Sequence, residues 1–253
     1  MSNASCDILT NILTVASSAE FTKEIFLLHG MTGSPEELLP AAKYLSVTCN
    51  ARVWLPRLRG HEDFRSLKTV KASEWTEQIL NLVEGVRKIS PRPLSIVGIS
   101  FGGLLALYAA QHFSASIEKL VLLAPPWRIK NKRQELLLSF LEYLPDKLLN
   151  IPIIRKKKRV KLVLPRICFS HHWVGAIVRM VKIRSALEPE WIKQPSLIIA
   201  DREDHQVSPD SLTTLAGRLP SSNVIFVPEA THELLLGEKY QEILGMISDF
   251  LMG

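Results

Sequence analysis

The segment that most constrains the fold runs from residue 94 to residue 110 and reads LSIVGISFGGLLALYAA. It begins as an apolar run typical of a strand buried on both faces and ends as an apolar helix. Ser100 stands between the two, with Gly98 and Gly102 two positions to either side. A strand that runs directly into a helix needs a sharp turn, and glycines there remove side chains that would collide across it. The pattern predicts a serine hydroxyl at the head of a sheet, with the N-terminus of the helix aimed at it.

Apolar runs rich in β-branched residues recur along the chain and predict further strands. They lie at residues 24–30, 52–58, 119–126, 196–201 and 223–230. Segments with helical periodicity alternate with these runs. The predicted helices cover residues 36–47, 73–88 with Ser73 as the N-cap, 101–113, 209–219 and 233–251. This alternation predicts an α/β fold with a mostly parallel sheet and helices on both faces.

Residues 127–193 interrupt the alternation. The segment holds 16 Lys and Arg against 5 Asp and Glu, a net charge of +11, and the remaining 15 Lys and Arg against 20 Asp and Glu leave −5. It combines two helix-like apolar pieces, at 134–144 and 173–183, with the basic run RKKKR at 155–159. We predict a core of residues 1–126 and 194–253, and a cap insertion of residues 127–193 over the carboxyl edge of the sheet, where ligands bind in open α/β folds.

Composition limits the class of protein and its compartment. A chain of 253 residues that is 47% hydrophobic can bury the core of one α/β domain. Its three cysteines are scattered without a CxxC pair, so they predict neither a disulfide framework nor a zinc site. No apolar window reaches the roughly 18 residues of a membrane span, and the first residues lack the basic region of a signal peptide. These features predict a cytoplasmic protein, with peripheral contact to a membrane left open.

A serine hydroxyl becomes an effective nucleophile when a base takes its proton and an acid orients the base. After a serine in a strand-turn-helix, the partners follow in the chain order acid, then histidine. Among the seven histidines, His232 alone stands in a loop just past the last predicted strand. The loop after residues 196–201 offers Asp201, Glu203 and Asp204. Asp204 lies further along this loop and is favoured by its reach to the histidine, with Asp201 as the alternative.

Acyl transfer through a tetrahedral intermediate also needs two N–H donors for the oxyanion. The backbone N–H of Phe101, directly after the serine, supplies one. The second is expected from the turn LLHGMTGSP at residues 27–35, where Gly30 frees the backbone and Met31 presents its N–H. His29 in the same turn is predicted to be a structural hydrogen-bonding residue rather than a base.

With these residues, the chain resembles the α/β-hydrolase family, and within it the small carboxylesterase and monoacylglycerol-lipase branch. The resemblance covers residues 24–126 and 194–252. It rests on the motifs FLLHGMTGSPEELLPAAKYL, RVWLPRLRGHEDF, ASEWTEQI, GISFGG, LIIADREDHQVSP and ATHELLL, in this order. It implies an acyl-enzyme mechanism without a metal or a cofactor. The implied roles are Ser100 as nucleophile, Asp204 as acid, His232 as base, and the N–H groups of Met31 and Phe101 as oxyanion hole, supported by Gly30, Gly98 and Gly102.

The predicted function is hydrolysis of carboxylic esters with a medium or long acyl chain, such as a monoacylglycerol or a lysophospholipid. A thioesterase with the same triad is the alternative among enzymes, and a non-catalytic binding protein of this fold is the alternative outside them. The leucine-rich piece at 134–144 either packs fully on the core or leaves a face for an acyl chain or for lipid. The basic run at 155–159 is either a solvated face or a site of attraction to anionic lipid. No recognised binding module accompanies it, so it does not predict nucleic-acid binding.

Overall fold

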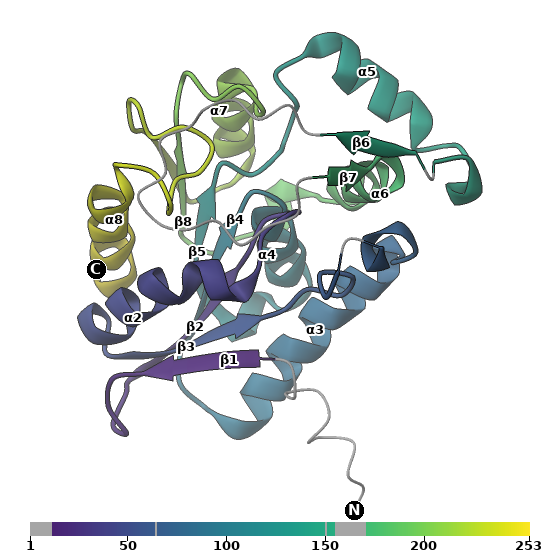
Figure 1. Ribbon diagram of the computed structural model, residues 1–253. Coiled ribbons are helices and arrows are strands. Elements are labelled where there is room, and N and C mark those ends of the chain that lie inside the picture. The colour runs from purple at the N-terminus through teal and green to yellow at the C-terminus, as the bar shows by residue number, and fades with distance from the viewer. Residues whose placement is uncertain (1–11, 64, 150, 155–170) are drawn as a thin grey trace, which may run out of the picture.

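The computed structural model describes residues 12–63, 65–149, 151–154 and 171–253, which Figure 1 shows as coloured ribbons. The basic run at 155–159 lies outside the described residues, as do Cys6 and Cys168 and the first part of the N-terminal segment. Cys49 is a free and buried thiol.

A seven-stranded sheet forms the centre of the molecule, in the order β1-β3-β2-β4-β5-β8-β9. The strands are β1 (Ile12–Ala16), β2 (Lys23–Leu28), β3 (Ala51–Pro56), β4 (Leu94–Ile99), β5 (Ile117–Leu123), β8 (Ser196–Ala200) and β9 (Ser222–Phe226). β1 pairs antiparallel with β3, and the other pairings within this sheet are parallel. All six predicted strands are confirmed, with small shifts at their ends. β1 was not predicted, since this edge strand buries none of its side chains fully.

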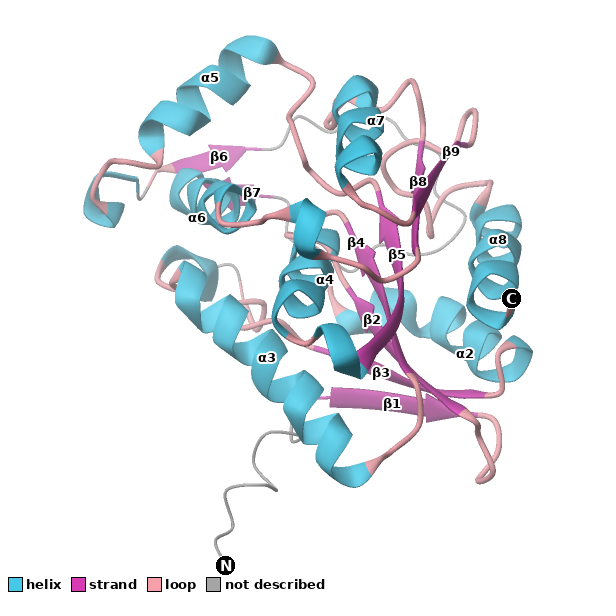
Figure 2. Cartoon of the chain, turned by 180° about the vertical axis from the view of Figure 1, so that it is seen from behind, coloured by secondary structure: helices cyan, strands magenta, loops and turns pink. Residues whose placement is uncertain are grey.

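Helices cover both faces of the sheet (Figure 2). α2 (Leu39–Thr48) and α8 (Tyr240–Met252) pack together on one face. α3 (Ala72–Ile89), α4 (Phe101–His112) and α7 (Pro209–Arg218) lie on the other face. A short 3-10 helix, Pro35–Leu38, precedes α2. The predicted α/β fold, with a mostly parallel sheet between two helical layers, is confirmed.

The start of α3 differs from the prediction by one residue, and its cap is another residue. The helix begins at Ala72, so Ser73 lies inside its first turn and is not the N-cap. Lys71 is the N-cap, and its backbone N–H donates a hydrogen bond to the Glu74 carboxylate over 2.7 Å. A glutamate three residues into the helix therefore supplies the capping interaction that was assigned to a serine hydroxyl.

The closing helix begins at Tyr240 and not at residue 233 as predicted. Residues 234–236 are three consecutive leucines, and all three are buried. A surface helix with one face toward the core mainly buries residues three or four positions apart, so three consecutive buried leucines are less typical of its first turn. The segment instead turns against the core, where the N–H groups of Leu236 and Gly237 both donate to the carbonyl of Glu233.

The described part of the segment between β5 and β8 holds two α-helices and a small sheet of its own. The helices are α5 (Lys132–Leu141) and α6 (Val174–Ser185), and β6 (Pro152–Ile154) pairs antiparallel with β7 (His171–Trp173). These elements stand beside the main sheet rather than within it (Figure 1). α5 packs on α6 through a small apolar cluster formed by Leu138, Leu149, Val178 and Val181. None of the helices within the described ranges is long and apolar enough to cross a membrane.

Candidate active site

The turn between β4 and α4 holds Ser100 in a strained backbone conformation. Its φ of 50° and ψ of −115° are rare for a residue with a side chain, and a hydrogen bond of 2.7 Å from its N–H to the carbonyl of Leu123 holds the turn against β5. A Cβ atom on Gly98 would overlap the carbonyl of Gly102, and one on Gly102 would overlap the carbonyl of Leu28. The two glycines therefore permit the close approach of strand, helix and neighbouring strand that the sequence pattern predicts.

Three side chains from distant parts of the sequence meet at this turn. The Ser100 hydroxyl donates to Nε2 of His232 over 3.2 Å, and Nδ1 of His232 donates to Asp204 Oδ2 over 2.7 Å. The side chains of His232 and Asp204 are 8% and 1% exposed, so water competes little for this contact. Because Nδ1 carries the proton toward the carboxylate, Nε2 is free to accept one from serine. Such a chain of contacts can activate a hydroxyl for attack on a carbonyl carbon.

The Asp204 carboxylate is held by more than the histidine. Its second oxygen accepts hydrogen bonds from the backbone N–H groups of Gln206, over 2.7 Å, and Val207, over 3.2 Å. Burial alone would raise the pKa of Asp204, but His232 and these N–H groups lower it below its ordinary value. The carboxylate is therefore ionised at neutral pH and fixed in one orientation.

Asp201, the alternative acid, makes different contacts. One of its carboxylate oxygens accepts from the N–H of Thr231 over 2.8 Å, and the other accepts from the N–H of Glu203 over 2.9 Å. Thr231 has a φ of 62° and directly precedes His232. Asp201 therefore ties the histidine loop to the acid loop through the backbone, while the structure brings Asp204 to the imidazole.

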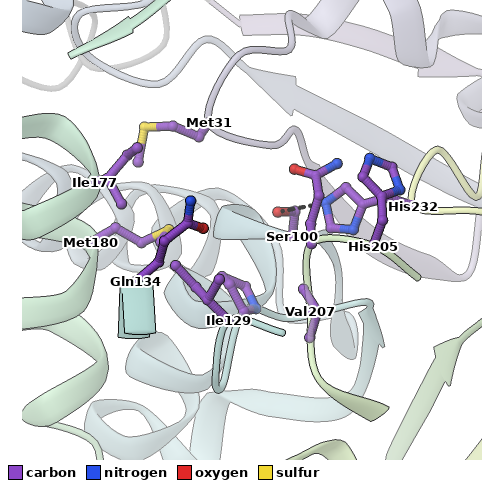
Figure 3. Close-up of a pocket in the computed structure, with 11 residues that line it drawn as sticks. Met31, Ser100, Ile129, Gln134, Ile177, Met180, His205, Val207 and His232 are labelled. Atoms are coloured by element: carbon purple, nitrogen blue, oxygen red, sulfur yellow. Dashed lines mark hydrogen bonds between the residues drawn. The ribbon is translucent and has the colours of Figure 1, made fainter. Parts of the chain in front are cut away.

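The two residues expected to supply the oxyanion hole, Met31 and Phe101, both lie beside Ser100. Phe101 is the first residue of α4, directly after Ser100, and its buried ring meets the ring of Trp75 edge-on at 4.8 Å between centroids. A Cβ on Gly30 would lie 3.5 Å from Cβ of Ser100, so the loop of Gly30 and Met31 faces the serine directly. Met31 also lines the cavity in front of Ser100 (Figure 3).

Two buried histidines, His29 and His61, lie against the loop of Gly30 and Met31 and contact its backbone. Nε2 of His29 accepts from the N–H of Leu58 over 3.1 Å, and Nε2 of His61 lies 2.8 Å from the carbonyl oxygen of Met31. Burial lowers the pKa of both imidazoles below the ordinary histidine value, and that of His29 well below it. His29 has the structural role that the sequence predicted. The contact of His61 with Met31 was not predicted, although His61 belongs to the motif RVWLPRLRGHEDF on which the family resemblance rests.

Two cavities meet at Ser100 and His232. The larger, about 240 Å³, is mainly apolar, and Figure 3 shows the side chains around it. Its lining is Met31, Ser100, Pro126, Ile129, Gln134, Ile177, Met180, His205, Gln206, Val207 and His232. The smaller, about 60 Å³, lies on the side of the Gly30–Gly33 loop and is more polar. The sequence did not predict that residues of α5 and α6 line this cavity. It also did not predict the position of Gln206, which belongs to the same loop as Asp204.

Comparison with known proteins assigns the chain to a family. The model of the alpha/beta hydrolase family matches residues 25–244 of the chain. A thermostable monoacylglycerol lipase from Bacillus sp. (strain H-257) is 31% identical over 91 residues, which are 35% of this chain and 35% of that protein. The match therefore spans about a third of the relative's length.

Solved structures of lipolytic enzymes share the fold. A structure from work on two metagenome-derived lipolytic enzymes, LipS and LipT, has a TM-score of 0.78 at 23% identity, over 96% of this chain and 97% of that one. A soluble variant of monoglyceride lipase from Saccharomyces cerevisiae, in complex with a substrate analogue, has a TM-score of 0.77 at 15% identity, over 95% and 90% of the two chains. Together with the family match over most of its length, these likenesses identify the chain as a member of the alpha/beta hydrolase family.

Proposed function

We propose that the protein is a serine hydrolase that cleaves carboxylic esters through an acyl-enzyme on Ser100. The observation that carries the proposal is the hydrogen-bonded series from the Ser100 hydroxyl through His232 to the buried carboxylate of Asp204. Ser100 attacks the ester carbonyl while His232 takes its proton. His232 then gives that proton to the leaving alcohol, and a water molecule activated in the same way releases the acid.

We propose the backbone N–H groups of Met31 and Phe101 as the oxyanion hole. Both belong to residues beside Ser100, and one of them opens α4, whose N-terminus carries a partial positive charge. The contact of His61 with the Met31 carbonyl and the packing of Phe101 on Trp75 support fixed positions for both donors. Donors fixed before the reaction need no reorganisation when charge develops on the oxygen.

We propose residues 1–126 and 194–253 as the hydrolase core and residues 127–193 as a cap over its active site. Ile177 and Met180 of α6 and Gln134 of α5 line the same cavity as Ser100, which supports this division. The apolar lining suits a medium or long acyl chain. We therefore propose a lipid ester, of the monoacylglycerol or lysophospholipid type, as the substrate.

Hydrolysis of p-nitrophenyl esters of increasing acyl length tests this function. We expect kcat/KM to rise about fourfold per added methylene until the apolar cavity is filled, because each buried CH₂ contributes about 0.8 kcal/mol. Met180→Trp narrows that cavity and is expected to move the optimum to shorter chains. Acyl thioesters of the same lengths are the comparison: turnover of thioesters alone would replace the esterase by a thioesterase. No turnover of either class by the folded protein would favour a non-catalytic binding role.

We also propose that the outer face of α5 rests on an anionic lipid surface. Leu136 and Phe140 lie four residues apart on α5 and are 74% and 67% exposed, so the helix is not fully packed. Tyr143, in the turn that follows the helix, is 82% exposed. Lys132 and Arg133 are exposed in the first turn of α5, and no ion pair joins either of them to another described residue. An apolar face next to unpaired cations matches an interfacial helix on anionic lipid. The same helix lines the active-site cavity through Gln134, so a lipid ester would enter beside this face.

Sedimentation with phosphatidylcholine vesicles, with and without phosphatidylglycerol, tests the lipid contact. Leu136→Ser with Phe140→Ser is expected to weaken binding at least tenfold, since each large apolar side chain contributes about 1.5 kcal/mol or more when buried. Lys132→Gln is expected to weaken binding only to the anionic vesicles. Val47→Ser is the matched control, because Val47 is 67% exposed but lies on α2. Equal binding by the double variant, or self-association without vesicles, would contradict the proposal.

A further inference from the structure

The smaller cavity beside Ser100 differs from the larger one in size and in chemistry. It measures about 60 Å³, and its polar lining comes mainly from Thr32, Glu37, Gln206 and Glu233. A water-sized group needs about 10–15 Å³ by the same measure, so this polar recess holds roughly four to six non-hydrogen atoms. An ester has two arms, and the apolar cavity suits the acyl arm. The polar recess is then left for a small alcohol arm.

Gln206 occupies the boundary between the two cavities and lines both. Its backbone is fixed on both sides, because its N–H donates to Asp204 over 2.7 Å and its carbonyl accepts from the N–H of Lys130 over 2.9 Å. Its side-chain Nε2 is buried and has no hydrogen-bond partner among the residues that the structure describes. Buried amide groups are nearly always hydrogen-bonded, so a donor held without a partner beside the reacting atoms indicates a ligand.

We propose that the Gln206 amide donates a hydrogen bond to a hydroxyl of the leaving alcohol, and that the polar recess selects a small neutral polyol. This inference rests on the proposed ester hydrolysis. His232, which lines the recess as well, would protonate the alcohol oxygen as its bond to the acyl carbon breaks, so the alcohol departs next to Gln206. The carboxyl groups of Glu37 and Glu233 line the recess and can accept from hydroxyl groups, whereas the headgroup of a lysophospholipid has more atoms than a recess of about 60 Å³ can hold. Between the two lipid esters proposed above, the recess therefore favours a monoacylglycerol over a lysophospholipid.

The test is the ratio of kcat/KM for a 1-monoacylglycerol to kcat/KM for the methyl ester of the same acid, both in the same detergent. The methyl ester has the same acyl arm and lacks the hydroxyl groups. We expect the wild type to prefer the glycerol ester and Gln206→Met to lower the ratio about tenfold, the effect of one lost hydrogen bond to a buried group. Gln206→Glu, which keeps the shape but removes the donor, is expected to lower it as well. Gln134→Met is the matched control and is expected to leave the ratio unchanged, because Gln134 lines the larger cavity and not the polar recess.

The possible results separate this inference from the proposed function. An unchanged ratio in both Gln206 variants would overturn the role of the amide. Equal hydrolysis of a monoacylglycerol and a lysophospholipid of the same acyl chain by the wild type would overturn the selection of a neutral alcohol. Both results leave the ester hydrolase standing, whereas a wild type that cleaves no ester would refute the proposed function and this inference with it. The glycerol ester and the methyl ester share the same acyl arm, so a loss of folded protein lowers kcat/KM for both equally. Their ratio changes only when the contact with the alcohol arm changes.

Discussion

Ser100→Ala is expected to lower kcat for ester hydrolysis by about five to six orders of magnitude. The hydroxyl is the group that would become covalently bound to the acyl chain, and the imidazole cannot replace it. Residual hydrolysis above the rate in water is expected from the oxyanion donors and from substrate binding. Steady-state turnover of the preferred p-nitrophenyl ester, with mass spectrometry for the acyl-enzyme, measures both expectations.

The Ser100→Ala protein is expected to keep the wild-type fold, so its loss of kcat reports on the missing hydroxyl. Alanine has the same Cβ as serine, so the strained turn with its φ of 50° is kept. Thermal unfolding measured beside the wild type checks this. His232→Ala is expected to cost about as much activity as Ser100→Ala, and the double variant little more, because residues that act as one unit are strongly non-additive. A Ser100→Ala protein that keeps a tenth of the wild-type activity would place the chemistry elsewhere.

The central strands and the serine turn could be predicted because their signals are local. A strand buried on both faces reads as an unbroken apolar run, and the Gly98 and Gly102 spacing describes a turn that few other structures need. The contact between Ser100 and His232 could also be predicted, although 132 residues separate them in the sequence. Parallel strands bring their carboxyl ends to one edge of a sheet, so the loops after β4 and β9 come together whatever the sequence distance.

The rest depends on contacts that no local pattern encodes. The leucines of α5 lie on several sides of the helix, so the periodicity could not tell that Leu138 is buried on α6 while Leu136 is exposed. Residues 234–236 have helical composition, so the sequence predicts that the closing helix begins at residue 233. In the structure these three leucines are buried in a turn, and the helix begins at Tyr240. Gln206 matters only because its side chain lies between two cavities, and cavities exist only after the elements have packed.

Asp204→Asn is expected to lower kcat about 10⁴-fold at neutral pH, although asparagine has nearly the same shape. Its amide nitrogen would donate to Nδ1 of His232, which moves the imidazole proton to Nε2. The imidazole could then no longer accept the proton of Ser100. The hydrogen bonds from the N–H groups of Gln206 and Val207 to the side-chain oxygen can remain, so a small effect on unfolding is expected.

Asp201→Asn is the matched control, three residues earlier in the same loop. Asp201 contacts the backbone of Thr231 and not the imidazole, so its replacement should act on stability. We expect a loss of about 1–3 kcal/mol in the free energy of unfolding, from one weakened contact to a partly buried N–H, and a change in kcat below about tenfold. Urea unfolding and kcat measured on both variants separate the two roles. If Asp201→Asn lost as much activity as Asp204→Asn at unchanged stability, the acid would have to be reassigned. The two aspartates differ because the imidazole needs a charged oxygen at one atom, whereas the loop needs only an acceptor.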